Sequence, residues 1–149
     1  RSTEMAMSSD VRTYAAAVRD FEAAAQNVAA QHEVRLVKLI GDAAMLASRR
    51  APDVVAAAAS LVANIAADNR FEAARGGVAF GRVVARDGDY YGPAVNLAAR
   101  LSGRAESGAV LVDEAVARSV PDIVIDAGTQ QLKGFSDAQR VFALRTAES

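Results

Sequence analysis

The sequence contains no cysteine and only one histidine, His32. Without cysteine the chain can form neither a disulfide framework nor a thiolate metal site, which is consistent with a reducing compartment. A single histidine excludes a multi-histidine metal centre. Any bound metal must therefore be held mainly by oxygen ligands, which is the preference of Mg²⁺ and Mn²⁺.

Long apolar runs and an excess of charge of one sign are also missing. The formal net charge is -1 over 149 residues, without a long basic run, so there is no electrostatic case for a nucleic-acid partner. No uncharged apolar stretch reaches the roughly 20 residues needed to cross a bilayer, so we expect no membrane contact by this chain itself. The length, with 52% hydrophobic and 23% charged residues, suits one globular domain over residues 1–149.

Two kinds of periodicity mark the N-terminal half. Apolar side chains recur three and four residues apart from Val11 to Val28, which predicts an amphipathic helix that ends near His32. We interpret this histidine as a structural residue beside the exposed carbonyls of the helix end. Residues 34–40 are rich in branched side chains and predict a strand, which a Gly-Asp turn joins to a return strand over residues 43–47.

Lys38 and Asp42 lie near the tip of this expected hairpin, where each has an ordinary structural interpretation. A lysine can simply discourage edge-to-edge pairing of strands, and an aspartate can simply form the turn. Spacing alone leaves both interpretations open.

Asp53 begins a second amphipathic pattern, which continues to Ile65 and predicts a helix. Residues 71–84 predict another strand, and this strand carries three glycines. The glycines do not match the Gly-x-Gly-x-x-Gly fingerprint, and no Gly-Lys-Ser/Thr phosphate loop occurs, so dinucleotide-fold and P-loop sites are excluded. They indicate instead a bulge or a close approach of the backbone to a neighbour.

Short elements follow in the last third of the chain. Residues 109–112 predict a strand, and Asp113 is a favoured N-cap for a short helix. Further strands are expected at residues 123–125 and 141–144, with a turn over residues 131–135. Because strands and helices alternate without a regular βα period, the pattern favours an α+β sandwich with helices on one face of a largely antiparallel sheet.

The stretch from residue 87 to residue 101 is a polar turn that leads into a helix, with Pro93 at a first helical position. On this helix Asn96 and Arg100 are four residues apart and project from one face. With Asp89 just upstream, the group can hold a polar ligand that bears phosphate. An ordinary solvated helix face fits the same spacing.

Two runs resemble the signatures of the class III nucleotidyl cyclases. They are DYYGPAVNLAAR at residues 89–100 and VKLIGD at residues 37–42, and they occur in the order of the family. The resemblance covers nearly the whole chain, and the two motifs are specific together though weak singly. It implies a ferredoxin-like (palm-type) form of the α+β sandwich.

The resemblance implies a role for each matching residue. Asp42 matches one of the two metal-binding aspartates of the family. Lys38 and Asp89 match the pair that reads the adenine ring, so the chain is similar to the ATP-using branch. Asn96 matches the asparagine that orients the ribose, and Arg100 matches the arginine that stabilises the transition state.

Two further cations match phosphate contacts of the family. Lys133, in the run LKGF, resembles a lysine that contacts the triphosphate, and Arg82, in the run FGRV, resembles a second phosphate contact. The implied reaction is adenylate cyclase activity, in which the ribose 3'-hydroxyl of ATP attacks the α-phosphorus and pyrophosphate leaves. The resemblance implies two Mg²⁺ or Mn²⁺ ions per site, because one ion can activate the hydroxyl while the other bridges the phosphates.

The first metal aspartate of the family lies on a strand before the first long helix, and residues 1–5 resemble the segment that follows that strand. Neither Glu4, Asp10 nor Asp20 matches this ligand by motif. We therefore expect either part of a longer cyclase or a catalytically silent cyclase-like domain that acts as a nucleotide-binding or dimerising regulatory module. A purely structural α+β domain would require both motifs to be coincidences.

The resemblance also implies a partner and a location. In these cyclases the metal aspartates come from one subunit and the purine and asparagine-arginine pairs come from the other. This chain carries both sets, as a two-fold homodimer with two equivalent sites requires. The expected location is the cytoplasm, either as a free domain or as the cytoplasmic part of a larger or membrane-anchored protein.

We expect residues 1–149 alone to show little or no cyclase activity, because half of the carboxylate set for two metal ions is missing from the motifs. An upstream segment that carries the aspartate should restore the activity. Cyclic AMP formation with Mg²⁺ or Mn²⁺ measures both, and full activity of the short chain would contradict the expectation.

Overall fold

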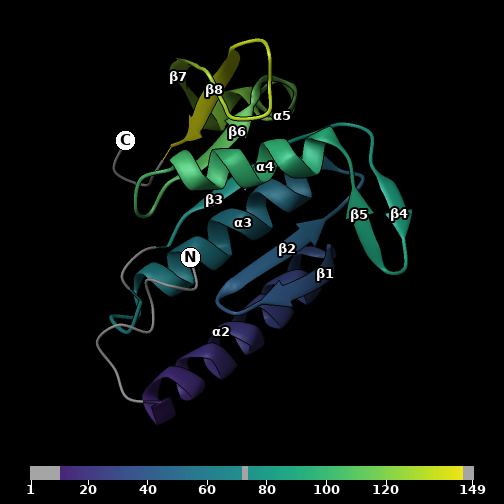
Figure 1. Ribbon diagram of the computed structural model, residues 1–149. Helices are drawn as coiled ribbons and strands as arrows, with labels where there is room; N and C mark the ends of the chain where they lie inside the picture. The colour runs from purple at the N-terminus through teal and green to yellow at the C-terminus, as the bar shows by residue number, and fades with distance from the viewer. Residues whose placement is uncertain (1–10, 72–73, 146–149) are drawn as a thin grey trace. The chain divides into compact units, whose positions relative to one another are not determined.

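The computed structural model describes residues 11–71 and 74–145, which form the ribbon of Figure 1. The chain separates into two compact units, residues 1–74 and residues 75–149, and each is described by itself. Among the described residues, no helix is long and apolar enough to span a membrane.

The N-terminal unit consists of two helices and one hairpin. Its elements are α2 (Val11–His32), β1 (Arg35–Ile40), β2 (Ala43–Ala47) and α3 (Ala51–Ala66). The helix α2 packs against both α3 and β1, and the two strands pair antiparallel around the turn at Gly41 and Asp42. The predicted first helix, hairpin and second helix are confirmed.

Apolar periodicity explains why these helices pack as they do. The buried side chains of α2 include Ala17, Phe21, Ala25 and Val28, which recur at helical spacing on one face. The ring of Phe21 also lies 6.3 Å from that of Phe71, in a tilted arrangement typical of aromatic pairs.

An ion pair joins α2 to the segment after α3. The Arg70 guanidinium lies 2.8 Å from the Asp20 carboxylate and also contacts Asp68, and the hydrogen bond from Arg70 lowers the pKa of the Asp68 carboxyl. Asp20 therefore has a structural partner. Glu4 and Asp10, also considered as metal ligands, lie outside the described residues.

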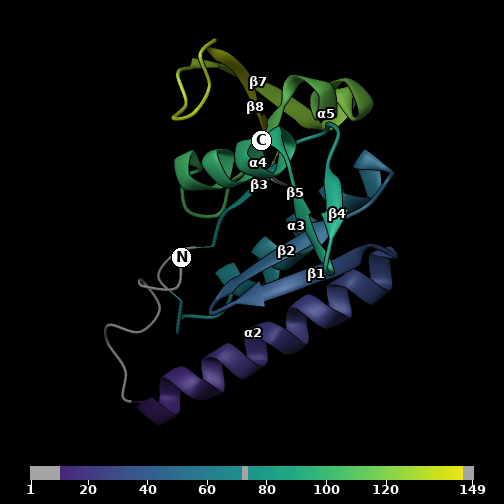
Figure 2. The ribbon, with the colours of Figure 1, turned by 45° about the vertical axis from the view of Figure 1, so that its right-hand side comes forward.

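The C-terminal unit is built on a four-stranded sheet with the order β3-β6-β8-β7. The strand β6 pairs parallel with β3 and antiparallel with β8, and β8 pairs antiparallel with β7. The elements are β3 (Gly76–Val78), β4 (Val84–Arg86), β5 (Asp89–Tyr91), α4 (Pro93–Arg104), β6 (Val110–Asp113), α5 (Glu114–Ser119), η1 (Pro121–Ile123), β7 (Val124–Gln130) and β8 (Gln139–Leu144). Figure 2 shows β4 and β5 as a separate two-stranded ribbon that leads into α4.

The helix α4 packs on β3 and β6 at an unusually close distance. A Cβ atom added at Gly77 would lie 2.3 Å from the Ala98 carbonyl oxygen and 2.4 Å from the Ser102 nitrogen. Glycine is therefore required at this point of β3, which confirms the predicted close backbone approach. The approach buries Leu97 and Leu101 in a core with Ala105, Leu111, Leu132 and Val141.

The prediction of one strand over residues 71–84 is wrong. Only β3 and β4 are strands in this range, and residues 79–83 form neither. The chain leaves the sheet after Val78, and the Phe80 N–H then donates to the Asp113 carboxylate, 3.3 Å away, rather than to a neighbouring strand. Residues 72 and 73 lie outside the described part of the chain.

The polar turn expected before α4 contains a second hairpin. Asp87 (φ 54°) and Gly88 (φ 79°) both have left-handed backbone, as a two-residue turn between twisted strands requires. They join β4 to β5, and Arg86 pairs with Asp89. The helix that follows ends at Arg104, one turn later than expected.

We expect Gly77→Ala to lower the free energy of unfolding by about 1–3 kcal/mol, because the added methyl group meets the backbone of α4. Gly81→Ala is the matched control, since its Cβ would meet only the Ala94 side chain, at 3.2 Å. Urea denaturation followed by circular dichroism measures both. Equal effects of the two substitutions would contradict the close approach.

Candidate functional site

The helix α4 presents Asn96 and Arg100 on its exposed side. The opposite side is anchored, because Leu97 is 8% exposed and Leu101 is fully buried. The helix begins after Gly92 (φ 143°), with Pro93 in its first turn. The predicted placement of an amide and a guanidinium together on one helix face is therefore what the structure has.

Asp89 lies in β5, immediately before this helix. Its side chain is half-buried, and its Oδ1 atom accepts a hydrogen bond of 2.7 Å from the Tyr90 N–H. The strand β5 contacts α4, and Asp89 lies at the turn end of this strand, where it pairs with Arg86.

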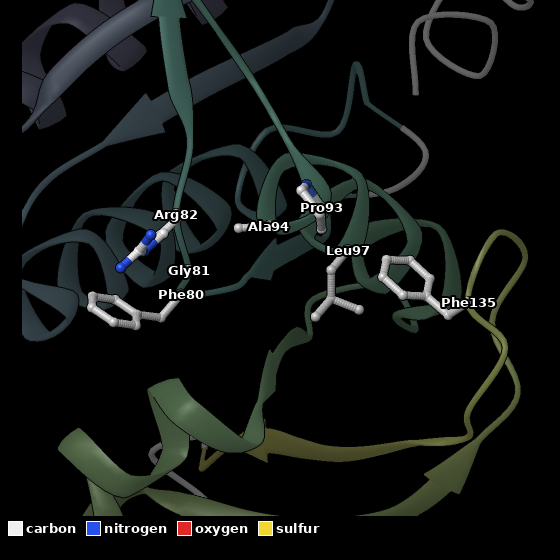
Figure 3. Close-up of a pocket in the computed structure, with 7 residues that line it drawn as sticks. All are labelled: Phe80, Gly81, Arg82, Pro93, Ala94, Leu97 and Phe135. Atoms are coloured by element: carbon white, nitrogen blue, oxygen red, sulfur yellow. The ribbon is translucent and has the colours of Figure 1, made fainter.

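Arg82 lies at an apolar pocket beside the start of α4. The pocket has a volume of about 220 Å³ and is lined by Phe80, Gly81, Arg82, Pro93, Ala94, Leu97 and Phe135 (Figure 3). Lys133 is exposed and precedes Phe135 by two residues. The carbonyl oxygen of Arg82 would lie 3.0 Å from a Cβ atom at Gly92, so the segment of Arg82 passes close to the first turn of α4.

Lys38 and Asp42 belong to the N-terminal unit. Lys38 is exposed on β1 opposite Met45, and Asp42 is half-buried in the turn that follows β1. The other predicted site residues belong to the C-terminal unit. The resemblance implies one site that combines residues of both units. That combined site stays a prediction.

The described residues supply only part of the oxygen ligands that a two-metal site needs. Asp42 supplies an oxygen ligand of the type that Mg²⁺ and Mn²⁺ prefer. No group of three or more His, Cys, Asp or Glu side chains gathers within residues 11–71 and 74–145. One carboxylate does not hold two ions, so the described residues fit only part of such a centre.

Asp113 has a second contact that its predicted role as a helix cap did not include. Its Oδ1 atom accepts from the Val116 N–H at 2.9 Å, which confirms the cap, and its Oδ2 atom accepts from the Phe80 N–H at 3.3 Å. The side chain is only 7% exposed. Burial raises the pKa of this carboxyl, and the two backbone hydrogen bonds partly oppose the rise.

The pocket itself was missed by sequence reasoning. Its two aromatic rings come from Phe80 and Phe135, which are in the runs FGRV and LKGF. The only available signal was a phenylalanine near each predicted phosphate contact. Their proximity depends on the tertiary fold, which neither run encodes locally.

Comparison with known proteins identifies relatives over most of the chain. An adenylate cyclase of Glutamicibacter nicotianae is 36% identical over 141 residues, which cover 92% of this chain and 35% of that protein. The chain thus spans about a third of the length of this relative. No protein-family model matches the chain.

Solved structures give the same result for the fold. An adenylate/guanylate cyclase/hydrolase from Silicibacter pomeroyi superposes with a TM-score of 0.72 at 26% identity, over 82% of this chain and 78% of that one. The adenylyl cyclase CyaB from P. aeruginosa superposes with a TM-score of 0.80 at 20% identity, over 97% of this chain and 88% of that one. The predicted ferredoxin-like (palm-type) α+β fold is confirmed.

The raised pKa of Asp113 predicts a pH dependence of stability. The folded chain holds this proton more firmly than the unfolded chain, so the stabilising contribution is complete below the ordinary carboxyl pKa of about 4. It is lost as the pH rises through the raised pKa. We expect the free energy of unfolding of the wild type, relative to Asp113→Asn, to fall over this range.

Urea denaturation at a series of pH values measures this difference. The amide of the Asp113→Asn variant cannot ionise, so the comparison isolates the one carboxyl group from the titration of the others. A difference that stays constant or grows with pH would contradict the assignment.

Proposed function

The chain belongs to the class III nucleotide cyclase domains, and on that premise we propose that it is an adenylate cyclase catalytic domain. It converts ATP to 3',5'-cyclic AMP and pyrophosphate. The observation that carries the proposal is the exposed face of α4, which presents Asn96 and Arg100 together on the helix that follows β5 and its Asp89. The adenylate cyclase relative at 36% identity supports it.

The anchoring of α4 gives Arg100 its catalytic value. Because Leu97 and Leu101 are buried, the backbone under the guanidinium is fixed before substrate binds. Donors that are already in place stabilise the charge that develops on the transferring phosphoryl group without reorganisation. Asn96, one turn earlier, orients the ribose so that its 3'-hydroxyl faces the α-phosphorus.

Lys38 and Asp89 select the base. A lysine ammonium donates to a ring nitrogen of adenine, and a carboxylate accepts from the exocyclic amine. The hydrogen bond from the Tyr90 N–H fixes the orientation of the Asp89 carboxylate, which can accept several hydrogen bonds at once. Guanine presents the opposite pattern of donors and acceptors, so this pair favours ATP over GTP.

Cationic side chains and metal ions neutralise the negative charge of the triphosphate. Arg82 and Lys133 are both exposed in the C-terminal unit and contact the phosphate oxygens. We propose two Mg²⁺ or Mn²⁺ ions, with Asp42 as one ligand and the remaining carboxylate from outside the described residues. Asp42 would hold one of these ions, and the bound ions would supply Lewis-acid activation of the 3'-hydroxyl and neutralisation of phosphate charge.

The working form is a homodimer. One protomer contributes Asp42. Its partner contributes Lys38 and Asp89, which select the base, together with Asn96 and Arg100. A two-fold axis then generates two equivalent sites. The ATP substrate thus binds between two copies of the chain.

The second candidate is a catalytically silent module that binds a nucleotide or dimerises with a cyclase. It is favoured because the described residues contain no group of three or more His, Cys, Asp or Glu side chains that could hold a metal ion. ATP binding without cyclic AMP formation in the presence of Mn²⁺, by a chain that carries the upstream aspartate, would support this candidate.

Mixing two inactive variants tests the shared site. In a chain that carries the upstream aspartate expected from the resemblance, Arg100→Ala should lower kcat by about 10²- to 10³-fold, through loss of one transition-state donor. Asp42→Ala should lose metal-dependent activity. An equal mixture should recover about a quarter of the wild-type activity, since half of the dimers are mixed and each has one intact site.

Arg104→Ala is the matched control, because Arg104 is an exposed arginine of the same helix that bonds the Gln131 carbonyl oxygen. It should keep its activity. Cyclic AMP formation is measured after subunit exchange, with dimer formation checked by analytical ultracentrifugation. Confirmed mixed dimers without recovered activity would refute the shared site.

A further inference from the structure

The pocket beside α4 has the features of a binding site for a small molecule. Figure 3 shows the rings of Phe80 and Phe135 on opposite sides of Leu97, with Pro93 and Ala94 at the start of the helix. We propose that this pocket binds an aromatic monocarboxylate, with its ring against the apolar lining and its carboxylate on Arg82. Binding itself is independent of cyclase activity.

The size and lining of the pocket set the apolar part of the ligand. Its volume is about 220 Å³, and an apolar cavity of about 150 Å³ is enough to hold benzene. One substituted ring or two fused rings therefore fit. Phe80 is 57% exposed, so an aromatic ligand removes apolar surface from water and packs against the phenyl groups.

The charged residue in the pocket lining determines the polar group of the ligand. Arg82 is the charged residue among those that line the pocket, and none of them is acidic. A guanidinium binds a carboxylate through two parallel hydrogen bonds, which favours an anion over a cation or a neutral molecule. The positive end of the α4 dipole lies at the same place and acts in the same direction.

Hydrogen bonds hold the backbone of both aromatic residues, Phe80 and Phe135. The backbone N–H of Phe80 donates to the buried Asp113 carboxylate at 3.3 Å. The backbone N–H of Phe135 donates to the Leu132 carbonyl oxygen at 3.1 Å, and its carbonyl oxygen accepts from the Gln131 side-chain amide at 2.7 Å. A pocket whose walls are fixed loses less entropy when a ligand binds.

A ligand here would compete with the nucleotide, and this consequence rests on the proposed function. Arg82 is one of the proposed contacts of the triphosphate, so a carboxylate that occupies its guanidinium removes that contact from ATP. The ligand also lies against the helix that carries Asn96 and Arg100. We expect inhibition that ATP relieves.

Binding of 1-naphthoate, read by saturation-transfer NMR and titration calorimetry without ATP, tests the pocket. Arg82→Gln should weaken the binding by about 10- to 100-fold, as expected for loss of a charged hydrogen-bond partner. Arg86→Gln, which changes an exposed arginine of β4 outside the pocket, is the matched control and should leave it unchanged.

The neutral analogue 1-naphthylmethanol separates the two parts of the site. It should bind more weakly than the carboxylate and be insensitive to Arg82→Gln, whereas Phe135→Ala should weaken both molecules. Phe135→Leu, which keeps an apolar side chain, is the second variant in case Phe135→Ala does not fold. Circular dichroism checks the folding of both. Absence of naphthoate binding, or binding that neither Arg82→Gln nor Phe135→Ala weakens, would overturn the proposal.

The two proposals fail in different ways. Naphthoate binding with the expected mutational pattern, in a chain that carries the upstream aspartate and still forms no cyclic AMP with Mn²⁺, supports the pocket and counts against the cyclase activity. Cyclic AMP formation without naphthoate binding supports the cyclase activity and counts against the pocket. Bound naphthoate that ATP does not displace would overturn the competition at Arg82.

Discussion

The contact between α4 and β3 at Gly77 is the constraint on which the C-terminal unit depends. The absence of a side chain there lets the helix backbone lie against the strand, with less room than one methyl group needs. That proximity places Leu97 and Leu101 in the core. A helix with one buried stripe can present only its other side to a ligand, so the contact at Gly77 also decides where Asn96 and Arg100 point.

Asp113 has a related function at the other end of β3. A buried carboxylate is costly unless its oxygens accept hydrogen bonds, and both oxygens of Asp113 do so. One bond begins α5 and the other holds Phe80 after the chain leaves the sheet. A single side chain therefore stabilises a helix start and the aromatic wall of the pocket together. The apolar core and the buried Asp113 carboxyl group together fix this part of the C-terminal unit.

Local patterns predicted well what local forces decide. The spacing of apolar residues gave α2 and α3, the cap residue Asp113 marked the start of α5, and the separation of Asn96 and Arg100 placed them on one face. The single strand over residues 71–84 was wrong because the chain leaves the sheet after Val78, where Phe80 bonds a carboxylate 33 positions away. The pocket needs Phe80, Leu97 and Phe135 together, and no local pattern brings segments so distant in sequence to one place.

The tight turn between β4 and β5 limits how this part of the chain can change in length. Its two left-handed residues fix the pairing of Arg86 with Asp89, and side chains along a strand alternate between the two faces of a ribbon. One residue inserted between this turn and Asp89 would move the Asp89 carboxylate to the other face of the ribbon. Substitutions in the β4–β5 hairpin are therefore tolerated far more readily than insertions or deletions.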